Sequence, residues 1–252
     1  MIHYHGGPIT PETCAERVWR GRHAMISWAH PYQIELAASV CQSFALDNGA
    51  FSLWRSGTPV DWDDYYEWTA QWLSHPACDW AIIPDVIDGS EEENDALVLD
   101  WPHGTHRGVP VWHLNESVDR LQRLTLLFPR VGLGSTAEFD VASPSRCVPR
   151  LREALMSVCD PTGVPRVKLH GLRMLNPAIT TVIPLASADS TNVARNIGID
   201  ACWTGTYAPA TKETRAVVLV ERIESHLTPF RLDCYAQASF DFEEHTLLEV
   251  CR

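Results

Sequence analysis

Short apolar runs recur along the chain, and longer segments with helical periodicity separate most of them. The runs are rich in Val, Ile, Leu and aromatic residues, so each predicts a strand buried on both faces, as in a parallel sheet. A strand followed by a helix, repeated eight times, predicts an α/β fold of the closed (β/α)8 TIM-barrel type. An open doubly wound sheet is the alternative. The eight predicted strands are 23–28, 43–47, 80–85, 109–114, 130–134, 166–170, 183–189 and 200–204.

The segments between these runs favour helices. Residues 118–128 form an amphipathic stretch, and Ser117 before it is a favourable N-cap. Residues 211–252 are less regular, and we expect them to form a C-terminal extension that packs on the barrel. The 252 residues suit one barrel domain, 1–252, with no linker inside it. Further helices are predicted over 32–42, 62–74, 91–100, 145–159 and 212–226.

Composition narrows the classes of function. The net charge of −12 argues against a broad, nonspecific nucleic-acid binder but leaves room for a local basic channel. No apolar stretch is long enough to span a bilayer, and the first residues lack the pattern of a signal peptide, so we expect a cytoplasmic protein that does not use a membrane. None of the eight cysteines pairs as CxxC, which predicts reduced and mostly buried thiols.

Polar residues gather where the predicted strands end. In a (β/α)8 barrel the carboxyl ends of the strands carry the active site, so residues at those positions are candidates for catalysis or binding. Aspartates end three of the predicted strands, at Asp47, Asp85 and Asp189. His113 and His170 end two others. This repeated placement predicts one active site built around the three aspartates.

Other interpretations of the same residues remain open. An aspartate after a strand is often the N-cap of the next helix, and a buried histidine is often structural. A metal site is conceivable if His3, His5 and His113 approach the three carboxylates, and this would favour a metal-dependent hydrolase. A barrel that only binds nucleic acid is a further, non-enzymatic alternative.

Two or three carboxylates in one pocket suit displacement at a sugar carbon. One carboxylate attacks C1′ or stabilises positive charge there, and another transfers the proton. Two successive displacements retain the anomeric configuration. The spacing of the aspartates does not select this chemistry over deacylation, aldol or isomerase reactions.

Five segments, in the same order along the chain, resemble the tRNA-guanine transglycosylase superfamily. LDNGAFSLW resembles the family's DSGGFQ segment, and IPDVIDGS resembles the segment with the substrate-reading aspartate. RVGLGS is similar to the GGLxxG loop, KLHGL to the YLMGVG segment, and ADSTNVARN to the FDCVLPTR segment that holds the nucleophile. The five segments are 46–54, 83–90, 130–135, 168–172 and 188–196.

One departure from the tRNA enzymes is informative. Those enzymes carry a CxCxxC cluster and a later histidine for structural zinc, whereas only Cys202, Cys234 and Cys251 follow Asp189 here. The zinc-binding subdomain is therefore expected to be absent. A short chain without it resembles the DpdA-type transglycosylases of bacteriophages, which exchange guanine in DNA for a 7-deazaguanine such as 7-cyano-7-deazaguanine (preQ0).

The resemblance implies a role for each matching residue, with no cofactor and no metal. Asp189 would attack C1′ of the target deoxyguanosine, Asp47 would be the general acid and base, and Asp85 would read the base. A tRNA or nucleoside transglycosylase is the alternative within the same chemistry. Other residues expected to contact the base are Phe51 or Trp112 by stacking, Gly132, Leu133 and Gly134 by their backbone, and His113 and His170.

DNA adds a physical requirement, because a carboxylate inside a barrel cannot reach C1′ of a paired nucleotide. The target nucleotide must be extruded or already single-stranded. Arginines supply the phosphate contacts that offset the cost of unstacking. Arg195 matches the family's arginine after the nucleophile, and Arg146, Arg150 and Arg173 follow two of the predicted strands. We expect these four to bind nucleic acid.

Overall fold

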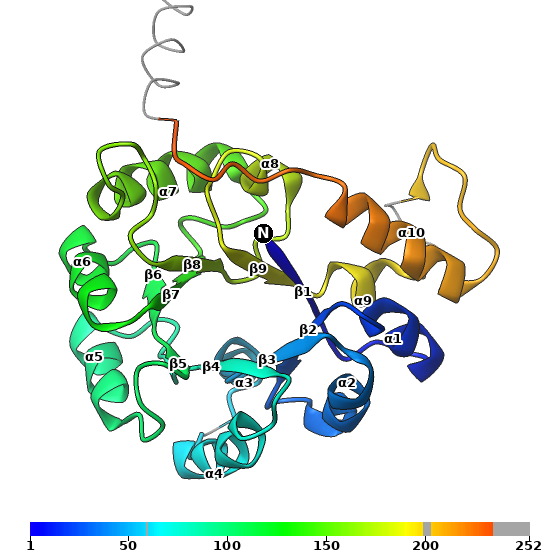
Figure 1. The fold of residues 1–252 in the computed structure, drawn as a ribbon, viewed down its shortest axis with the longest axis horizontal. Coiled ribbons are helices and arrows are strands. Elements are labelled where there is room, and N and C mark those ends of the chain that lie inside the picture. The colour runs from blue at the N-terminus through cyan, green and yellow to red at the C-terminus, as the bar shows by residue number, and fades with distance from the viewer. Residues whose placement is uncertain (59, 199–202, 234–252) are drawn as a thin grey trace, which may run out of the picture.

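The computed structural model describes residues 1–58, 60–198 and 203–233. Nine parallel strands form one sheet in the order β5-β4-β3-β2-β1-β9-β8-β7-β6, and the sheet curls into a nearly closed barrel (Figure 1). The strands are β1 (Ile2–Gly6), β2 (His23–Ser27), β3 (Ser43–Asp47), β4 (Cys78–Ile82), β5 (Gly108–Val109), β6 (Val111–His113), β7 (Arg130–Gly134), β8 (Lys168–Gly171) and β9 (Ser187–Ser190).

The short strands β5 and β6 are two parts of one barrel strand. Pro110 separates them because proline has no N–H to donate to a ladder. Its carbonyl still accepts a hydrogen bond from the Gly132 amide at 2.8 Å. β5 pairs with β4 and β6 pairs with β7, so this interrupted strand joins the two ends of the sheet. The result is the eight-stranded barrel that the sequence predicts.

The first strand of the barrel differs from the prediction. β1 (Ile2–Gly6) lies between β2 and β9, although the sequence analysis placed residues 3–5 before the first strand. Of the predicted strand 200–204, residues 200–202 lie outside the described part, and Trp203 and Thr204 are in a turn. β1 was missed because two of its five residues are histidines, so the segment does not form a continuous apolar run in the sequence.

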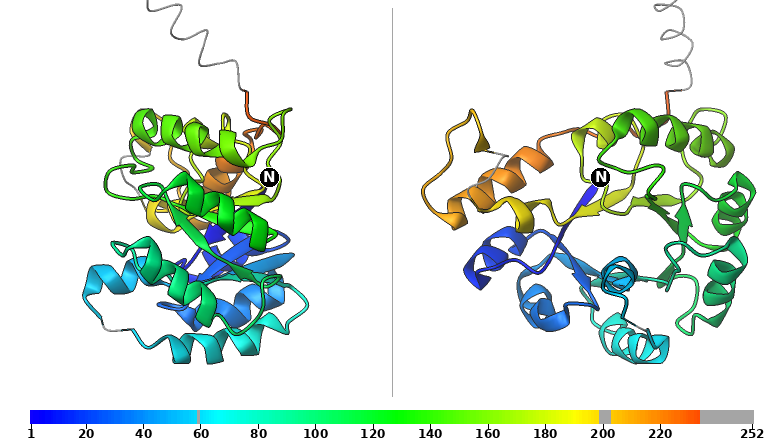
Figure 2. Two further views of the ribbon diagram at one scale, coloured as in Figure 1. Left: turned by 90° about the vertical axis from the view of Figure 1, so that its left-hand side faces the viewer. Right: turned by 180° about the vertical axis from the view of Figure 1, so that it is seen from behind.

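Helices surround the barrel as an outer ring (Figure 1, Figure 2). α10 packs against α1 and α9, so the described part of the predicted C-terminal extension contains a helix of this ring. None of the helices in the described residues is long and apolar enough to cross a membrane. The helices are α1 (Glu12–Trp19), α2 (Ile34–Val40) after the 3-10 turn η1 (Pro31–Gln33), α3 (Ala50–Ser56), α4 (Trp62–Leu73), α5 (Glu91–Asp100), α6 (Val118–Leu127), α7 (Pro144–Val158), α8 (Pro177–Thr180), α9 (Asn192–Asn196) and α10 (Lys212–Glu224).

Side chains alternate between two buried environments along each strand, which is why the strands read as continuous apolar runs. One set points into the barrel and forms a small cluster that includes Tyr4, Met25, Trp80 and Val111. The other set packs against the helices and forms the larger core. At the carboxyl ends of the strands the inward positions become polar, and this end of the barrel holds the site.

Candidate active site

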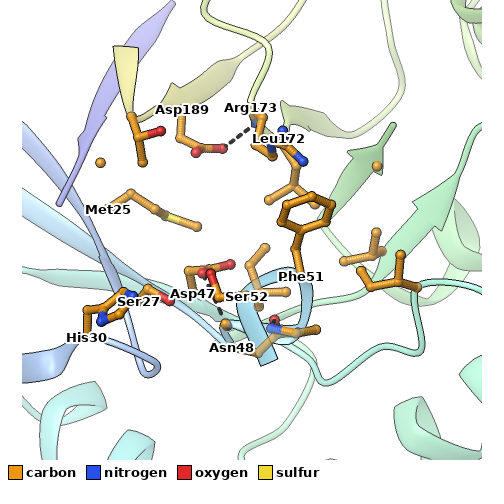
Figure 3. Close-up of a pocket in the computed structure, with 18 of the residues that line it drawn as sticks. Met25, Ser27, His30, Asp47, Asn48, Phe51, Ser52, Leu172, Arg173 and Asp189 are labelled. Atoms are coloured by element: carbon orange, nitrogen blue, oxygen red, sulfur yellow. Dashed lines mark hydrogen bonds between the residues drawn. The ribbon is translucent and has the colours of Figure 1, made fainter. Parts of the chain in front are cut away.

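A cavity of about 640 Å³ opens at the carboxyl ends of the strands. Its lining runs from β1 through β3 and β6 to β9, and Asp47, Asp85 and Asp189 all contribute to it. Figure 3 shows Asp47 and Asp189 among the lining residues. The three aspartates therefore share one cavity, as the sequence analysis expected. They come together because each occupies an inward position at or just beyond the end of its strand.

Asp189 lies on β9 at the wall of the cavity and is 7% exposed. Its Oδ1 accepts a hydrogen bond from the Arg173 backbone amide at 2.9 Å, and His170 Nε2 lies 3.3 Å from the same oxygen. Arg173 adopts a left-handed backbone conformation, with φ of 60°, in the turn that brings its amide to Asp189. Oδ2 accepts no hydrogen bond from the described residues. Asp189 thus has one anchored oxygen and one oxygen available for chemistry.

Asp47 ends β3 and lies across the cavity from Asp189 (Figure 3). Burial and the charge of Asp189 raise the pKa of Asp47 to about 7, and Asp85 adds to the rise, while the hydrogen bond from the Gly49 amide opposes it. A carboxyl with this pKa exchanges a proton readily near neutral pH. Asp47 is therefore suited to general acid and base catalysis.

The turn after Asp47 requires glycine at position 49. Gly49 has φ of 72°, and a Cβ there would lie 2.9 Å from the backbone nitrogen and the Cβ of Ala29. The Gly49 amide donates to Asp47 Oδ2 at 3.1 Å, and α3 begins at the next residue. The sharp turn thus holds Asp47 and directs α3 toward the barrel axis, where it borders the cavity (Figure 1).

Asp85 is held by two partners. Its Oδ1 accepts from Asn48 Nδ2 at 2.7 Å, and its Oδ2 lies 2.9 Å from His113 Nε2. Burial alone would lower the pKa of His113, but hydrogen bonds to Asp85 and Glu116 and the charges of both carboxylates outweigh it, and the pKa rises to about 9. Glu116 Oε2 in turn accepts a hydrogen bond from Arg120 Nη1 at 2.6 Å. A buried chain of alternating acidic and basic side chains therefore holds the Asp85 carboxyl group in place.

This chain corrects the role expected for His113. The ring lines the cavity, but Nε2 faces Asp85 and Nδ1 lies 3.4 Å from Glu116. Both ring nitrogens are therefore directed at carboxylates rather than at a base. A Cβ on Gly134 would lie 2.9 Å from His113 Cδ2, so glycine at position 134 leaves room for the ring. His113 supports Asp85 instead of donating to a substrate carbonyl.

An aromatic ring and arginines border the mouth of the cavity. The guanidinium carbon of Arg173 lies 4.1 Å from the centroid of the Phe51 ring, which is 36% exposed. Arg55 and Arg195 line the same cavity. In the described residues none of the three arginines has a carboxylate partner, so their charges are available to an anionic ligand. Arg55 was not predicted, although it lies one helical turn after Phe51.

Two predicted site residues lie in the core instead. Trp112 and Leu133 are fully buried and point outward from their strands into the core beneath the helices. Placing the Trp112 ring against the base was wrong, because Trp112 is one position out of phase with the inward residues of its strand. The contact expected of Leu133 was through its backbone, and Leu133 is not part of the cavity lining. Arg150 covers the Trp112 ring and donates to the Leu114 carbonyl at 2.8 Å.

Other predicted residues lie outside the cavity lining. Arg146 and Arg150 do not line the cavity that holds the aspartates but border a separate hollow beside α7, and their expected binding of nucleic acid stays a prediction. Gly132 is an inward position one step below Gly134, and His170 lies inside the barrel beneath Asp189. Neither of these two contributes to the lining of the cavity.

The sequence analysis also missed Ser27, which pairs in register with Asp47 at the end of β2 and lines the cavity. The signal was present, because Ser27 ends a predicted strand in the same way as the aspartates. The Ser27 hydroxyl is buried and has no hydrogen-bond partner within the described residues.

The histidines proposed for a metal site do not converge. His5 is on the outer face of β1, where its Nε2 lies 2.9 Å from Glu224 of α10. His113 is inside the barrel and is engaged by Asp85 and Glu116. Among the described residues, no three His, Cys, Asp or Glu side chains are grouped so as to hold a metal ion.

The fold and the site define a (β/α)8-barrel protein with a three-carboxylate cavity at the carboxyl ends of its strands. Comparison with known family models, with curated proteins and with solved structures finds no significant match to the chain. The function is therefore argued from the cavity and from the sequence resemblance.

Proposed function

We propose that the protein is a guanine transglycosylase that exchanges guanine in DNA for a 7-deazaguanine through a covalent aspartyl-deoxyribose intermediate. The observation that carries the proposal is the pairing of Asp47 and Asp189 in one cavity with different environments. Asp189 presents a free oxygen, whereas Asp47 has a pKa of about 7 and can hold a proton at neutral pH. Two carboxyl groups whose environments separate their roles are typical of displacement at an anomeric carbon.

The reaction requires two displacements. In the first, Asp189 Oδ2 forms a bond to C1′ while the C1′–N9 bond breaks, and the departing guanine takes the electron pair and a proton from Asp47. In the second, the incoming 7-deazaguanine gives its N9 proton to Asp47, and its nitrogen forms the new bond to C1′ as Asp189 leaves with its electron pair. After the second step Asp47 again carries a proton and Asp189 is again a free carboxylate, and the sugar keeps its configuration.

Asp85 is suited to reading a guanine-like base. The ring N–H and the exocyclic amine of guanine are neighbouring donors, and a carboxylate accepts two such donors. The hydrogen bonds from Asn48 and His113 hold Asp85 in place, so its side chain is organised before the base arrives. The Phe51 ring at the mouth, with Arg173 over it, offers a stacking surface for a base or a neighbouring nucleotide.

The size and the charge of the cavity suit a nucleotide in a polymer. About 640 Å³ is within the range of sites for small organic ligands and allows an extruded nucleoside to enter. Arg55, Arg173 and Arg195 border the cavity and can bind phosphates on either side of the target. The choice of DNA over tRNA rests on the sequence resemblance to the small phage enzymes.

Nucleoside mass spectrometry tests the proposal directly. Purified protein is incubated with preQ0 and either single-stranded DNA, duplex DNA or tRNA, and each polymer is digested and analysed for the modified nucleoside. We expect preQ0 deoxynucleoside from DNA without added metal. Asp189→Ala should abolish exchange, while the control Asp119→Asn, on the exposed face of α6, should not. Modification of tRNA alone would overturn the DNA assignment, and undiminished exchange by Asp189→Ala would overturn the mechanism.

A further inference from the structure

A row of polar side chains crosses the barrel interior beneath the cavity and ends at Asp189. Arg130 Nη1 donates to Ser187 Oγ at 3.0 Å, Ser187 Oγ lies 2.9 Å from His170 Nδ1, and His170 Nε2 lies 3.3 Å from Asp189 Oδ1. Ser187 and His170 have no exposed surface. The row spans β7, β8 and β9, whose parallel register places His170 beside Ser187. It connects the amino end of the barrel to the proposed nucleophile.

The chemistry of the row favours one nitrogen of His170 as the carrier of the proton. A guanidinium can only donate, so Ser187 Oγ accepts from Arg130, and its own hydrogen is free to donate to His170 Nδ1. The ring proton is then on Nε2, which faces Asp189. The opposite tautomer would set the lone pair of Nε2 against a carboxylate oxygen. Burial lowers the pKa of His170 despite the nearby Asp189, which favours the neutral ring.

One hydrogen bond and one longer contact reach the same oxygen of Asp189. The Arg173 amide donates to Oδ1 at 2.9 Å, whereas His170 Nε2 lies 3.3 Å from Oδ1 without forming a hydrogen bond in this conformation, and Oδ2 is left without a protein donor in the described residues. We propose that His170 is a positioning residue that orients Asp189 with Oδ2 toward the substrate, and that Ser187 and Arg130 hold His170 in the tautomer this requires. The inference rests on the proposed function for the role of Asp189, and it changes the expected role of His170 from covering the base to supporting the nucleophile.

The second displacement gains most from this arrangement. In the covalent intermediate Oδ1 is an ester carbonyl oxygen, which accepts only weakly. When the new base attacks C1′, the C1′–Oδ2 bond breaks and its electron pair returns the negative charge to Asp189. A hydrogen bond to a carboxylate is roughly twice as strong as one to a neutral acceptor, so the Nε2–H stabilises Asp189 as it leaves. Loss of the donor should therefore slow release of the intermediate.

The tautomer can be measured without any substrate. In protein labelled with 15N-histidine, nitrogen NMR shifts distinguish Nδ1 from Nε2 protonation, and His170→Gln identifies the His170 signals by their absence. We expect a neutral ring protonated at Nε2, and a mixture of tautomers in Ser187→Ala. The charged or titratable groups that face this ring are Asp189, Arg130 and Tyr4. A ring protonated at Nδ1, or an unchanged tautomer in Ser187→Ala, would overturn the inference.

Exchange kinetics test the role of the donor. Gln and Met are similar in size, but only Gln can donate to Asp189 and accept from Ser187, so His170→Gln and His170→Met form a matched pair. We expect His170→Gln to keep kcat within about tenfold of the wild-type value and His170→Met to lose about a hundredfold, with KM for DNA little changed. The covalent intermediate should also accumulate in His170→Met. Equal kcat values for the two variants would overturn the inference. Absence of exchange in the wild-type protein would instead refute the proposed function, and the NMR result would stand independently.

Discussion

Replacing Asp47 with asparagine should make the protein more stable, and increasingly so as the pH rises. The pKa of Asp47 rises from its ordinary 3.8 to about 7 on folding, because the carboxyl is desolvated and lies near Asp189 and Asp85. A carboxyl with a raised pKa in the folded state binds more protons folded than unfolded. Its contribution to stability is therefore most favourable at low pH and falls as the pH rises from about 4 to about 7.

The size of the effect follows from the two pKa values. A pKa that rises from 3.8 to about 7 destabilises the ionised folded state by about 4 kcal/mol. About 2.5 kcal/mol of this cost develops between pH 5 and pH 8, because the unfolded carboxyl is already mostly ionised at pH 5. Water in the open cavity screens part of the charge, so we expect Asp47→Asn to gain between about 1 and 2.5 kcal/mol over that range.

Chemical denaturation measures this gain. Unfolding in urea at pH 5, 6, 7 and 8 gives the free energy of unfolding for the wild-type protein, Asp47→Asn and the control Asp119→Asn. The difference between Asp47→Asn and wild type should widen with pH, and the midpoint of thermal unfolding should rise by about 2–4 °C for each kcal/mol gained. The control should follow the wild type. A constant difference across this pH range would show that Asp47 has an ordinary pKa, and would remove the argument for its acid and base role.

Two further predictions test the neighbours of the catalytic pair. His113→Gln should destabilise the protein by about 3 kcal/mol, because it removes the buried positive charge between Asp85 and Glu116. Urea unfolding at pH 7 measures the effect. A change in the free energy of unfolding within about 0.5 kcal/mol would mean that the chain of charges does not hold Asp85. Arg195→Ala should weaken DNA binding and lower the slope of log K against log salt by about 1. Fluorescence anisotropy across salt concentrations measures this slope. The control Arg20→Ala, on the outer surface, should leave the slope unchanged. Equal slopes for both arginine variants would place the DNA elsewhere.

The sequence predicted the barrel because the signal for it is local and repeated. Each buried strand is a short apolar run, and each end is marked by a polar residue, so the order of the elements could be read without three-dimensional information. The same rule selected Asp47, Asp85 and Asp189, which line one cavity. It failed for β1, where two histidines occupy outward positions, one of which, His5, is buried where its ring contacts Glu224 of α10.

The phase of the strands could not be obtained from the sequence. In a barrel the inner face and the helix-covered face are both apolar, so a run such as that around Trp112 does not show which residues point inward. A shift of one residue exchanges the two faces, which explains why the Trp112 ring was assigned to the site and proved to be core. Which residues point inward is decided only by the strand register, and the register depends on the neighbouring strands.

The chain by itself indicated the alternation of strands and helices and the positions of three carboxylates at strand ends. The tertiary structure decided what those carboxylates can do. Asp85 is held by His113, Asp47 gains its raised pKa from burial and from Asp189, and Asp189 is anchored through one oxygen by the Arg173 amide, with His170 Nε2 3.3 Å from that oxygen. These properties depend on distances between residues far apart in sequence and on the exclusion of water, and neither exists until the barrel closes.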